Sequence, residues 1–266
     1  MKLVANIKLQ PTPEQADLLQ QTLERCNAAC NWISEQAWGA EMFRQFDLHK
    51  LVYQETRERF NLASQVSVRC IAKVADAYKL DKKTQRVFRS LGAQPYDDRL
   101  FRLVSDEQVS IWTLHGRIKV SYVCGDHQRR LLEHRKGEVD LMFVRGHWYI
   151  AAVCDFDDPD LLAPQGVLGV DLGIVNIATD STGEQFSGKD VEANREWYAK
   201  RRATLQKKGT RAARRLLKKM SGKQRRFQKW VNHNVSCRIV SKAERSRCAI
   251  GLEDLKHIRQ RAKANK

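Results

Sequence analysis

The 266-residue sequence contains no Cys-x-x-Cys pair, although it has seven cysteines. An odd number of cysteines without paired spacing argues against a disulfide framework and against a zinc ribbon, so no zinc is expected within this chain. Cys26 and Cys30 lie one turn apart in a helical pattern. We interpret them as core residues rather than metal ligands, because no second Cys or His pair has matching spacing.

The sequence also lacks a run of 18 apolar residues and a secretory signal. These absences argue against a membrane-spanning protein and against export. We therefore expect a cytoplasmic or nucleoid-associated protein with no membrane partner.

Acidic residues become scarce in the last part of the chain. Residues 1–165 hold 23 Lys/Arg and 22 Asp/Glu, whereas residues 166–266 hold 25 and 9. The densest stretch, residues 195–229, has 15 basic residues and one acid, Glu196. Such a block attracts polyanions and makes binding salt-dependent. Nucleic acid is favoured over a membrane surface, because no strongly apolar helical face lies nearby.

Residues 1–90 begin with an alternating strand pattern over 1–10. The stretch PTPEQ then predicts a helix start, with Thr12 as N-cap, Pro13 in the first turn and Gln15 completing a capping box. Helical periodicity continues, with a break at residues 61–64, to about Tyr78. The sequence predicts a helical bundle over residues 11–90.

From about Tyr96 the apolar period changes to two, with hairpin turns at residues 115–117 and at Arg145-Gly146. Because a lone first strand is not stable, residues 1–10 are expected to pair with this sheet. The sequence therefore predicts a β domain of residues 1–10 and 91–160, barrel-like in form, with the helical bundle as an insertion. Residues 155–165 are expected to be a linker.

The last part begins with the apolar run GVLGVDLGIVNIATD, residues 166–180. It predicts two strands, buried on both faces, joined by a tight turn at Asp171 to Gly173. A short strand at 184–186 follows, then a basic helical block over 191–246, broken at Ser221-Gly222, and a last strand ending in LEDL. The fold class predicted for the whole chain is mixed α/β and α+β.

Asp171 and Glu253 both stand at the carboxyl end of a short apolar strand. Such ends collect ligand-binding and catalytic groups. If the two strands are neighbours, the carboxylates repel each other unless a divalent cation lies between them. Asp171 is equally compatible with a simple turn-capping role, and Asp254 competes with Glu253 as the second acid.

The order of these motifs resembles the transposon-encoded TnpB (OrfB) family: PTPEQ, GVDLGIVNIAT, a basic helical block, WVNHNVSCRIV and IGLEDL. The resemblance implies an RNA-guided DNA endonuclease, annotated in the family as a transposase and related to type V CRISPR effectors. It implies an RNA-binding wedge domain (1–10 and 91–160), a recognition insertion (11–90) and an incomplete RNase H-like, RuvC-like nuclease domain (166–266). Guide RNA, double-stranded DNA and single-stranded DNA are the implied partners.

The resemblance also implies roles for individual residues. Asp171 and Glu253 match the first two acidic ligands, catalytic and binding Mg²⁺. Asn232 and His233 match an Asn-His pair that either contacts nucleic acid or packs in the helix. Trp197 and Tyr198 are expected to pack, with base stacking as the alternative. The basic residues expected to bind phosphates are Arg201, Arg202, Lys207, Lys208, Arg214, Arg215, Lys218 and Lys219.

Members of that family continue into a zinc ribbon and a third acidic residue, which are not found in this sequence. With two of three carboxylates, Mg²⁺ is expected to be held weakly and cleavage by this chain alone to be slight. Two other hypotheses remain open. One is a non-catalytic RNA-guided binder such as a repressor, and the other is a strand-joining recombinase, which requires a nucleophile or complete triad that the sequence does not indicate.

Overall fold

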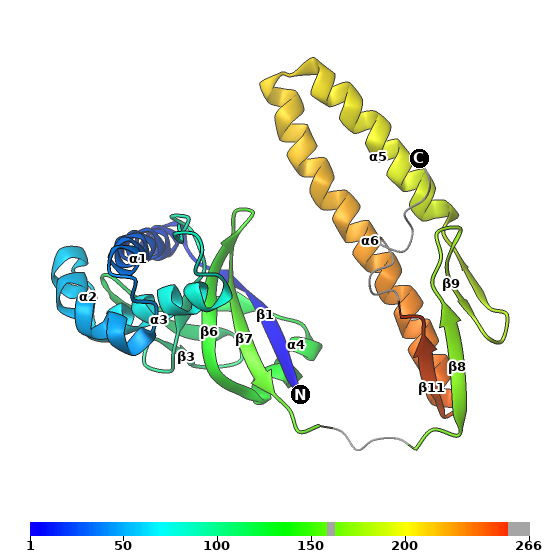
Figure 1. Ribbon diagram of the computed structural model, residues 1–266, viewed down its shortest axis with the longest axis horizontal. Coiled ribbons are helices and arrows are strands. Elements are labelled where there is room, and N and C mark those ends of the chain that lie inside the picture. Colours follow the sequence, from blue (N-terminus) through cyan, green and yellow to red (C-terminus); the bar gives the residue numbers. More distant parts are fainter. Residues whose placement is uncertain (159–162, 255–266) are drawn as a thin grey trace. The chain divides into compact units, whose positions relative to one another are not determined.

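The computed structural model describes residues 1–158 and 163–254 (Figure 1). The chain forms two compact units, and the boundary between them along the sequence falls within the predicted linker. Of that linker, residues 159–162 lie outside the described residues. Among the described helices, each is too short or too polar to cross a lipid bilayer.

The first unit is built on a seven-stranded antiparallel sheet in the order β2-β6-β7-β1-β5-β4-β3. Its strands are β1 (Lys2–Gln10), β2 (Gln94–Tyr96), β3 (Phe101–Leu103), β4 (Gln108–Thr113), β5 (Gly116–Val123), β6 (Arg135–Val144) and β7 (His147–Asp155). β1 pairs with β7 on one side and with β5 on the other, so it lies in the centre of the sheet. The first strand therefore joins the later sheet, as predicted, and the helical segment is inserted between β1 and β2.

The sheet curls into a near-barrel. Its two edge strands, β2 and β3, are separated in the chain by only four residues, Asp97 to Leu100. A connection of that length reaches across the edges only if they approach each other. The Tyr96 hydroxyl of β2 donates to the Trp112 carbonyl of β4, the strand beside β3, at 3.0 Å, so the two ends of the sheet are in contact.

Three helices form the inserted bundle: α1 (Pro13–Gly39), α2 (Gln45–Phe60) and α3 (Ser64–Leu80). α1 and α3 contact the sheet, and α2 packs on α1 and α3. The predicted capping box at the start of α1 is present, with both Thr12–Gln15 hydrogen bonds formed. Cys26 and Cys30 are buried in the core that the helices share with the sheet, and all seven cysteines are free thiols. The helical and β parts therefore form one hydrophobic core.

The predicted extension of helix to about residue 90 is wrong. α3 ends at Leu80, and residues 81–93 run without regular structure along α1. Polar side chains of α1, spaced at helical intervals, bind the backbone of this segment: Ser34 donates to the Arg86 carbonyl (2.7 Å), and Asn31 both donates to and accepts from Phe88 (2.9 and 2.7 Å). These bonds replace the intrahelical ones.

A short helix, α4 (Asp126–Glu133), lies between β5 and β6 where none was predicted. The Gly125 amide donates to the Gln128 side chain at 3.1 Å at its start, and Leu131 and Leu132 are buried. Eight residues show only two turns of periodicity, which is too little for a sequence pattern to identify.

The second unit contains a four-stranded sheet in the order β10-β9-β8-β11 and two long helices. Its elements are β8 (Gly166–Asp171), β9 (Asn176–Asp180), β10 (Gln185–Ser187), α5 (Lys189–Lys208), α6 (Arg211–Arg245) and β11 (Cys248–Leu252). The β8–β11 pair is parallel and the other two pairs are antiparallel.

The C-terminal half of α6 packs on one face of this sheet, where Ile239 and Ala243 contact the core residues Leu168, Val170 and Ala178. The expectation of strands buried on both faces is wrong for the described residues. Val167 is 68% exposed, and the turn residues Ile174 and Val175 are 90% and 78% exposed. Within the part of the chain that the structure describes, only one face of the sheet carries a helix.

The predicted helix break at Ser221-Gly222 is also wrong, because α6 runs through it. The break lies at Gly209, which adopts φ +62° as the C-cap of α5, and at Thr210, whose side chain accepts from the Ala213 amide at 3.2 Å. A left-handed glycine followed by an N-cap threonine stops and restarts the chain, whereas an internal glycine only weakens a helix.

Candidate metal site and nucleic-acid interface

Asp171 and Glu253 lie at the carboxyl ends of adjacent parallel strands. Val170 of β8 is paired with Leu252 of β11. Asp171 directly follows Val170 in the sequence, and Glu253 directly follows Leu252. Neighbouring strands are about 4.8 Å apart, so the two backbone positions are side by side. Two acids separated by 82 positions in the chain are thereby brought to one edge of one sheet.

The two acids also share a face of the sheet. The even-numbered residues Leu168 and Val170 point to α6, and strand alternation turns Gly169 and Asp171 to the opposite face. Glu253 follows the same alternation on β11, where Gly251 comes two residues earlier. A shallow hollow of about 480 Å³ lies here, and its lining includes Gly169, Asp171, Thr179, Ser181, Gly251 and Glu253.

Both acidic side chains are exposed, and neither forms a hydrogen bond or salt bridge with a described residue. Two carboxylates without protein partners suit Mg²⁺, which commonly binds one or two carboxylates and completes its octahedral shell with waters and substrate phosphates. The residues present therefore fit such a cation. Among residues 1–158 and 163–254 there is no group of three or more His, Cys, Asp or Glu placed to hold a metal ion.

A third acid in this sheet, Asp180, has a different environment. It is paired with Val170 and so faces α6, where its side chain is fully buried and forms a salt bridge with Lys242. Its other carboxylate oxygen accepts from the Thr182 hydroxyl (2.7 Å) and from the Thr182 and Glu184 amides (3.0 Å each). The hydrogen bond from Lys242 holds the pKa of Asp180 well below its usual range.

Lys242 binds Glu184 as well, at 2.9 Å, and Arg238 binds Glu184 at 2.6 Å. This ion-pair network joins α6 to the turn between β9 and β10. Sequence analysis did not find it, because the partners are about 60 residues apart and their spacing carries no motif. Asp180 is therefore a structural residue and is not available as a third ligand beside Asp171.

The basic block forms an antiparallel helical hairpin of α5 and the N-terminal half of α6 (Figure 1). Its seam is small and apolar: Tyr198 and Leu205 of α5 pack against Ala213, Leu217 and Met220 of α6. All eight basic residues predicted to bind phosphates are exposed: Arg201, Arg202, Lys207, Lys208, Arg214, Arg215, Lys218 and Lys219. Arg202 also donates to Gln224 across the hairpin at 2.9 Å.

On α6 the charges lie away from the seam. At 100° per residue, Arg214, Arg215, Lys218 and Lys219 are about 90° or more around the helix from the mean direction of the seam residues. The hairpin therefore presents a basic surface that its own packing does not use.

The two aromatic residues of α5 differ in their exposure. Tyr198 is buried in the hairpin seam, as expected. Trp197 is 57% exposed and contacts the Tyr198 ring edge-on, with 4.9 Å between the centroids. Trp230, which sequence analysis did not single out, is 63% exposed beside the basic residues of α6.

Asn232 and His233 are both exposed. Asn232 lies one turn before Val235, which packs against the sheet core, and therefore shares the helix face directed at the sheet. The His233 ring instead contacts the Cys237 sulfur at 3.7 to 3.8 Å on another face.

Comparison with known proteins agrees with these observations. Residues 152–257 match the OrfB_IS605 family, described as a probable transposase. The match covers less than half of the chain, and it agrees with the TnpB/OrfB resemblance that the order of motifs indicated. No curated protein matches the chain.

Among solved structures, the chain is similar to a Cas12f1–sgRNA–target DNA complex, with a TM-score of 0.64 and 13% identity, covering 94% of this chain and 67% of that one. A CRISPR-Cas12f ternary complex gives a TM-score of 0.46 and 11% identity over 96% of this chain and 67% of that chain. The first likeness concerns the fold, and it confirms a mixed α/β architecture with a near-barrel sheet. The RNase H-like assignment of the second unit stays a prediction.

Proposed function

We propose that the protein is an RNA-guided DNA-binding protein associated with a transposable element, and that its second unit is a nuclease-type domain. The observation that carries the proposal is the placement of Asp171 and Glu253 side by side on an open sheet face, in a unit that also presents a basic helical hairpin. The match of residues 152–257 to a transposase family supports it, as does the fold shared with a Cas12f1–sgRNA–target DNA complex.

In this proposal the hairpin holds the sugar-phosphate backbone of DNA or of an RNA–DNA heteroduplex, because its exposed Lys and Arg neutralise phosphates. The first unit binds the guide RNA, and base pairing between guide and target reads the sequence. Asp171 and Glu253 hold the cation beside the bound strand. When bound, Mg²⁺ supplies an activated water and stabilises the charge on the leaving oxygen of the phosphodiester.

The alternative is an RNA-guided binder that does not cleave, such as a repressor. One observation favours it: the acidic pair is not joined by a third ligand among the described residues, since Asp180 is committed to Lys242. Both alternatives require the basic hairpin, and only the first requires the acids.

The test compares wild type with Asp171→Asn/Glu253→Gln, with Thr179→Val as a control that alters the same hollow without removing a charge. Fe²⁺ substituted for Mg²⁺, with ascorbate and peroxide, cuts a polypeptide near its metal site. The site predicts cuts near residues 171 and 253 in wild type and in the control, but not in the double variant. Cuts that persist in the double variant contradict the metal site.

Cleavage and binding are then measured separately on a guide–target pair, by Mg²⁺-dependent product formation and by fluorescence anisotropy. A nuclease loses product in the double variant and retains DNA affinity. If wild type and both variants bind DNA and none of them cleaves it, the alternative is supported. If the wild type binds neither RNA nor DNA, both functions are refuted.

A further inference from the structure

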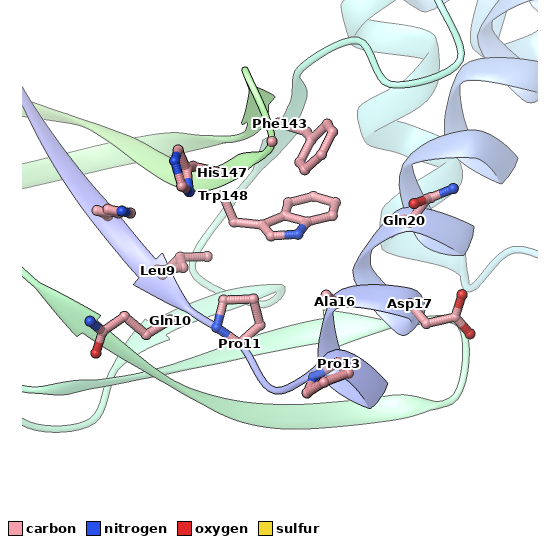
Figure 2. Close-up of a pocket in the computed structure, with 12 residues that line it drawn as sticks. Leu9, Gln10, Pro11, Pro13, Ala16, Asp17, Gln20, Phe143, His147 and Trp148 are labelled. Carbon is pink, nitrogen blue, oxygen red and sulfur yellow. The ribbon is translucent and has the colours of Figure 1, made fainter.

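A cavity of about 620 Å³ in the first unit lies where β1 leads into α1 and where the β6–β7 hairpin turns back (Figure 2). This volume is in the range that accommodates a small organic ligand. It lies in the unit that does not carry the acidic pair, so it is a separate site from the one described above.

One wall of the cavity is aromatic. Phe143 and Trp148, on either side of the hairpin turn, have ring centroids 4.8 Å apart. Trp148 is only 5% exposed, yet its indole N–H forms no hydrogen bond with a described residue. Among the described residues, the Arg69 Nε is the one fully enclosed side-chain N or O atom without a hydrogen-bond partner. The Trp148 nitrogen, which also lacks a partner, is therefore not fully enclosed and keeps contact with the open space of the cavity. Figure 2 shows the indole nitrogen on the side of Pro11 and Pro13.

The opposite wall is held rigidly. Pro11 and Pro13 flank Thr12, whose capping box with Gln15 fixes the start of α1, and Gln15 donates to the Lys119 carbonyl at 2.9 Å. A preformed slot between an aromatic wall and two prolines suits a flat ring, because little conformational entropy is lost on binding.

The rim adds a cation and an imidazole, and the lining also includes the carboxylate of Asp17, which accepts a hydrogen bond from the Gln21 side chain at 2.6 Å. Lys8 and His147 border the cavity, and their side chains form no hydrogen bond or ion pair with a described residue. Lys8 is paired across the sheet with Tyr149, and strand alternation puts both on the outer face of the sheet, opposite to Leu9 and Trp148. A nucleotide whose ring fills the cavity extends its phosphate toward this outer edge of the sheet, where Lys8 lines the cavity.

We propose that this cavity binds one unstacked base of a single-stranded RNA, with the ring against Phe143, an acceptor atom of the base receiving the Trp148 N–H, and the neighbouring phosphate at Lys8. Single-stranded RNA is recognised in this manner, by splayed bases that stack on aromatic rings and bond through their edges. The choice of RNA as the occupant rests on the proposed function, while the slot, the free N–H and the rim cation are independent of it.

The experiment uses the full chain and hexaribonucleotides of each base, with matching hexadeoxynucleotides, and measures affinity by fluorescence anisotropy. Wild type is expected to prefer one base. Trp148→Phe keeps the ring and removes the N–H, and it should lower affinity for the preferred hexamer about tenfold and flatten the preference. Lys8→Gln alters only the rim and should lower affinity for all four hexamers by a similar factor.

Photocrosslinking with 5-iodouridine or 4-thiouridine hexamers provides a readout that a folding defect does not mimic. Crosslinks in wild type should map to the peptide containing residues 143–148. Crosslinks confined to α5 and α6, an unchanged preference in Trp148→Phe, or equal binding of deoxy hexamers would overturn the proposal.

The two proposals fail in distinguishable ways. If the chain binds long RNA in a salt-dependent manner while the cavity variants change nothing, the cavity proposal falls and the proposed function stands. If hexamers occupy the cavity but no guide RNA supports DNA binding, the proposed function falls and the cavity site stands.

Discussion

Neutralising the basic face of α6 should reduce the salt dependence of nucleic-acid binding by an amount that the helix geometry predicts. Nine Lys and Arg lie between Arg211 and Lys229, and all are exposed. That segment is about 27 Å long at 1.5 Å per residue. A single strand of B-DNA presents roughly eight phosphates over the same length. The surface therefore has enough charge and length to contact a continuous row of phosphates.

The variant replaces Arg214, Arg215, Lys218 and Lys219 by Gln. Each phosphate contact contributes about 0.9 to the slope of log K against log salt for duplex DNA and about 0.7 for a single strand. Losing four contacts should lower the slope by about 3.6 or 2.8, respectively. Between 50 and 200 mM salt this removes roughly 100-fold of the change in affinity for a duplex.

The assay is fluorescence anisotropy of duplex and single-stranded probes from 50 to 300 mM KCl. Gln has nearly the same helix propensity as Lys and Arg, and none of the four side chains lies in the hairpin seam, so the fold should be kept. The matched control exchanges each Lys for Arg and each Arg for Lys. A slope that changes by less than about 1 in the Gln variant, or by as much in the control, would refute the reasoning.

Two further predictions concern stability. Lys242→Met removes the partner that lowers the carboxyl pKa of both Asp180 and Glu184. The stabilisation from a lowered carboxyl pKa is complete above the unfolded value of about 4 and is lost as pH falls below it. The free energy of unfolding of the second unit, measured with denaturant, should therefore differ strongly between wild type and variant at pH 7, and the difference should shrink toward pH 2. A difference that does not change with pH would contradict the role of Lys242. Ile150→Ala empties a fully buried position of the first core and should cost that unit about 2 to 5 kcal/mol. Calorimetry should show a lower Tm for the first unit and an unchanged transition for the second, and a shift of both would argue against two separately folded units.

Much of the first unit was predictable because its signals are local. The Thr12 capping box and the 3,4 spacing of apolar residues define α1, and the Arg145-Gly146 turn defines the last hairpin. The segment of residues 81–93 was not predictable, since its conformation depends on hydrogen bonds from Asn27, Asn31 and Ser34 of α1, whose partners lie 52 to 63 positions later in the chain. The Trp148 cavity has the same origin in long-range packing.

In the second unit, sequence patterns indicated the two acids and the basic helices but misplaced the helix break and overestimated the burial of the strands. The break at Gly209 depends on a local left-handed backbone conformation. The basic helical block contains a second glycine, Gly222, and residue type alone does not show which of the two glycines adopts that conformation. Strand burial depends on what covers each face, and an apolar run does not specify this.

The sequence by itself determined where charge, caps and apolar periods lie, because these properties belong to short stretches of chain. Only the tertiary structure decided which carboxylates are available. The pairing of β11 with β8 brings Glu253 beside Asp171, and strand alternation turns both to the open face while it turns Asp180 to Lys242. Register and face are properties of the assembled sheet, so identical residue types at neighbouring positions acquire opposite roles.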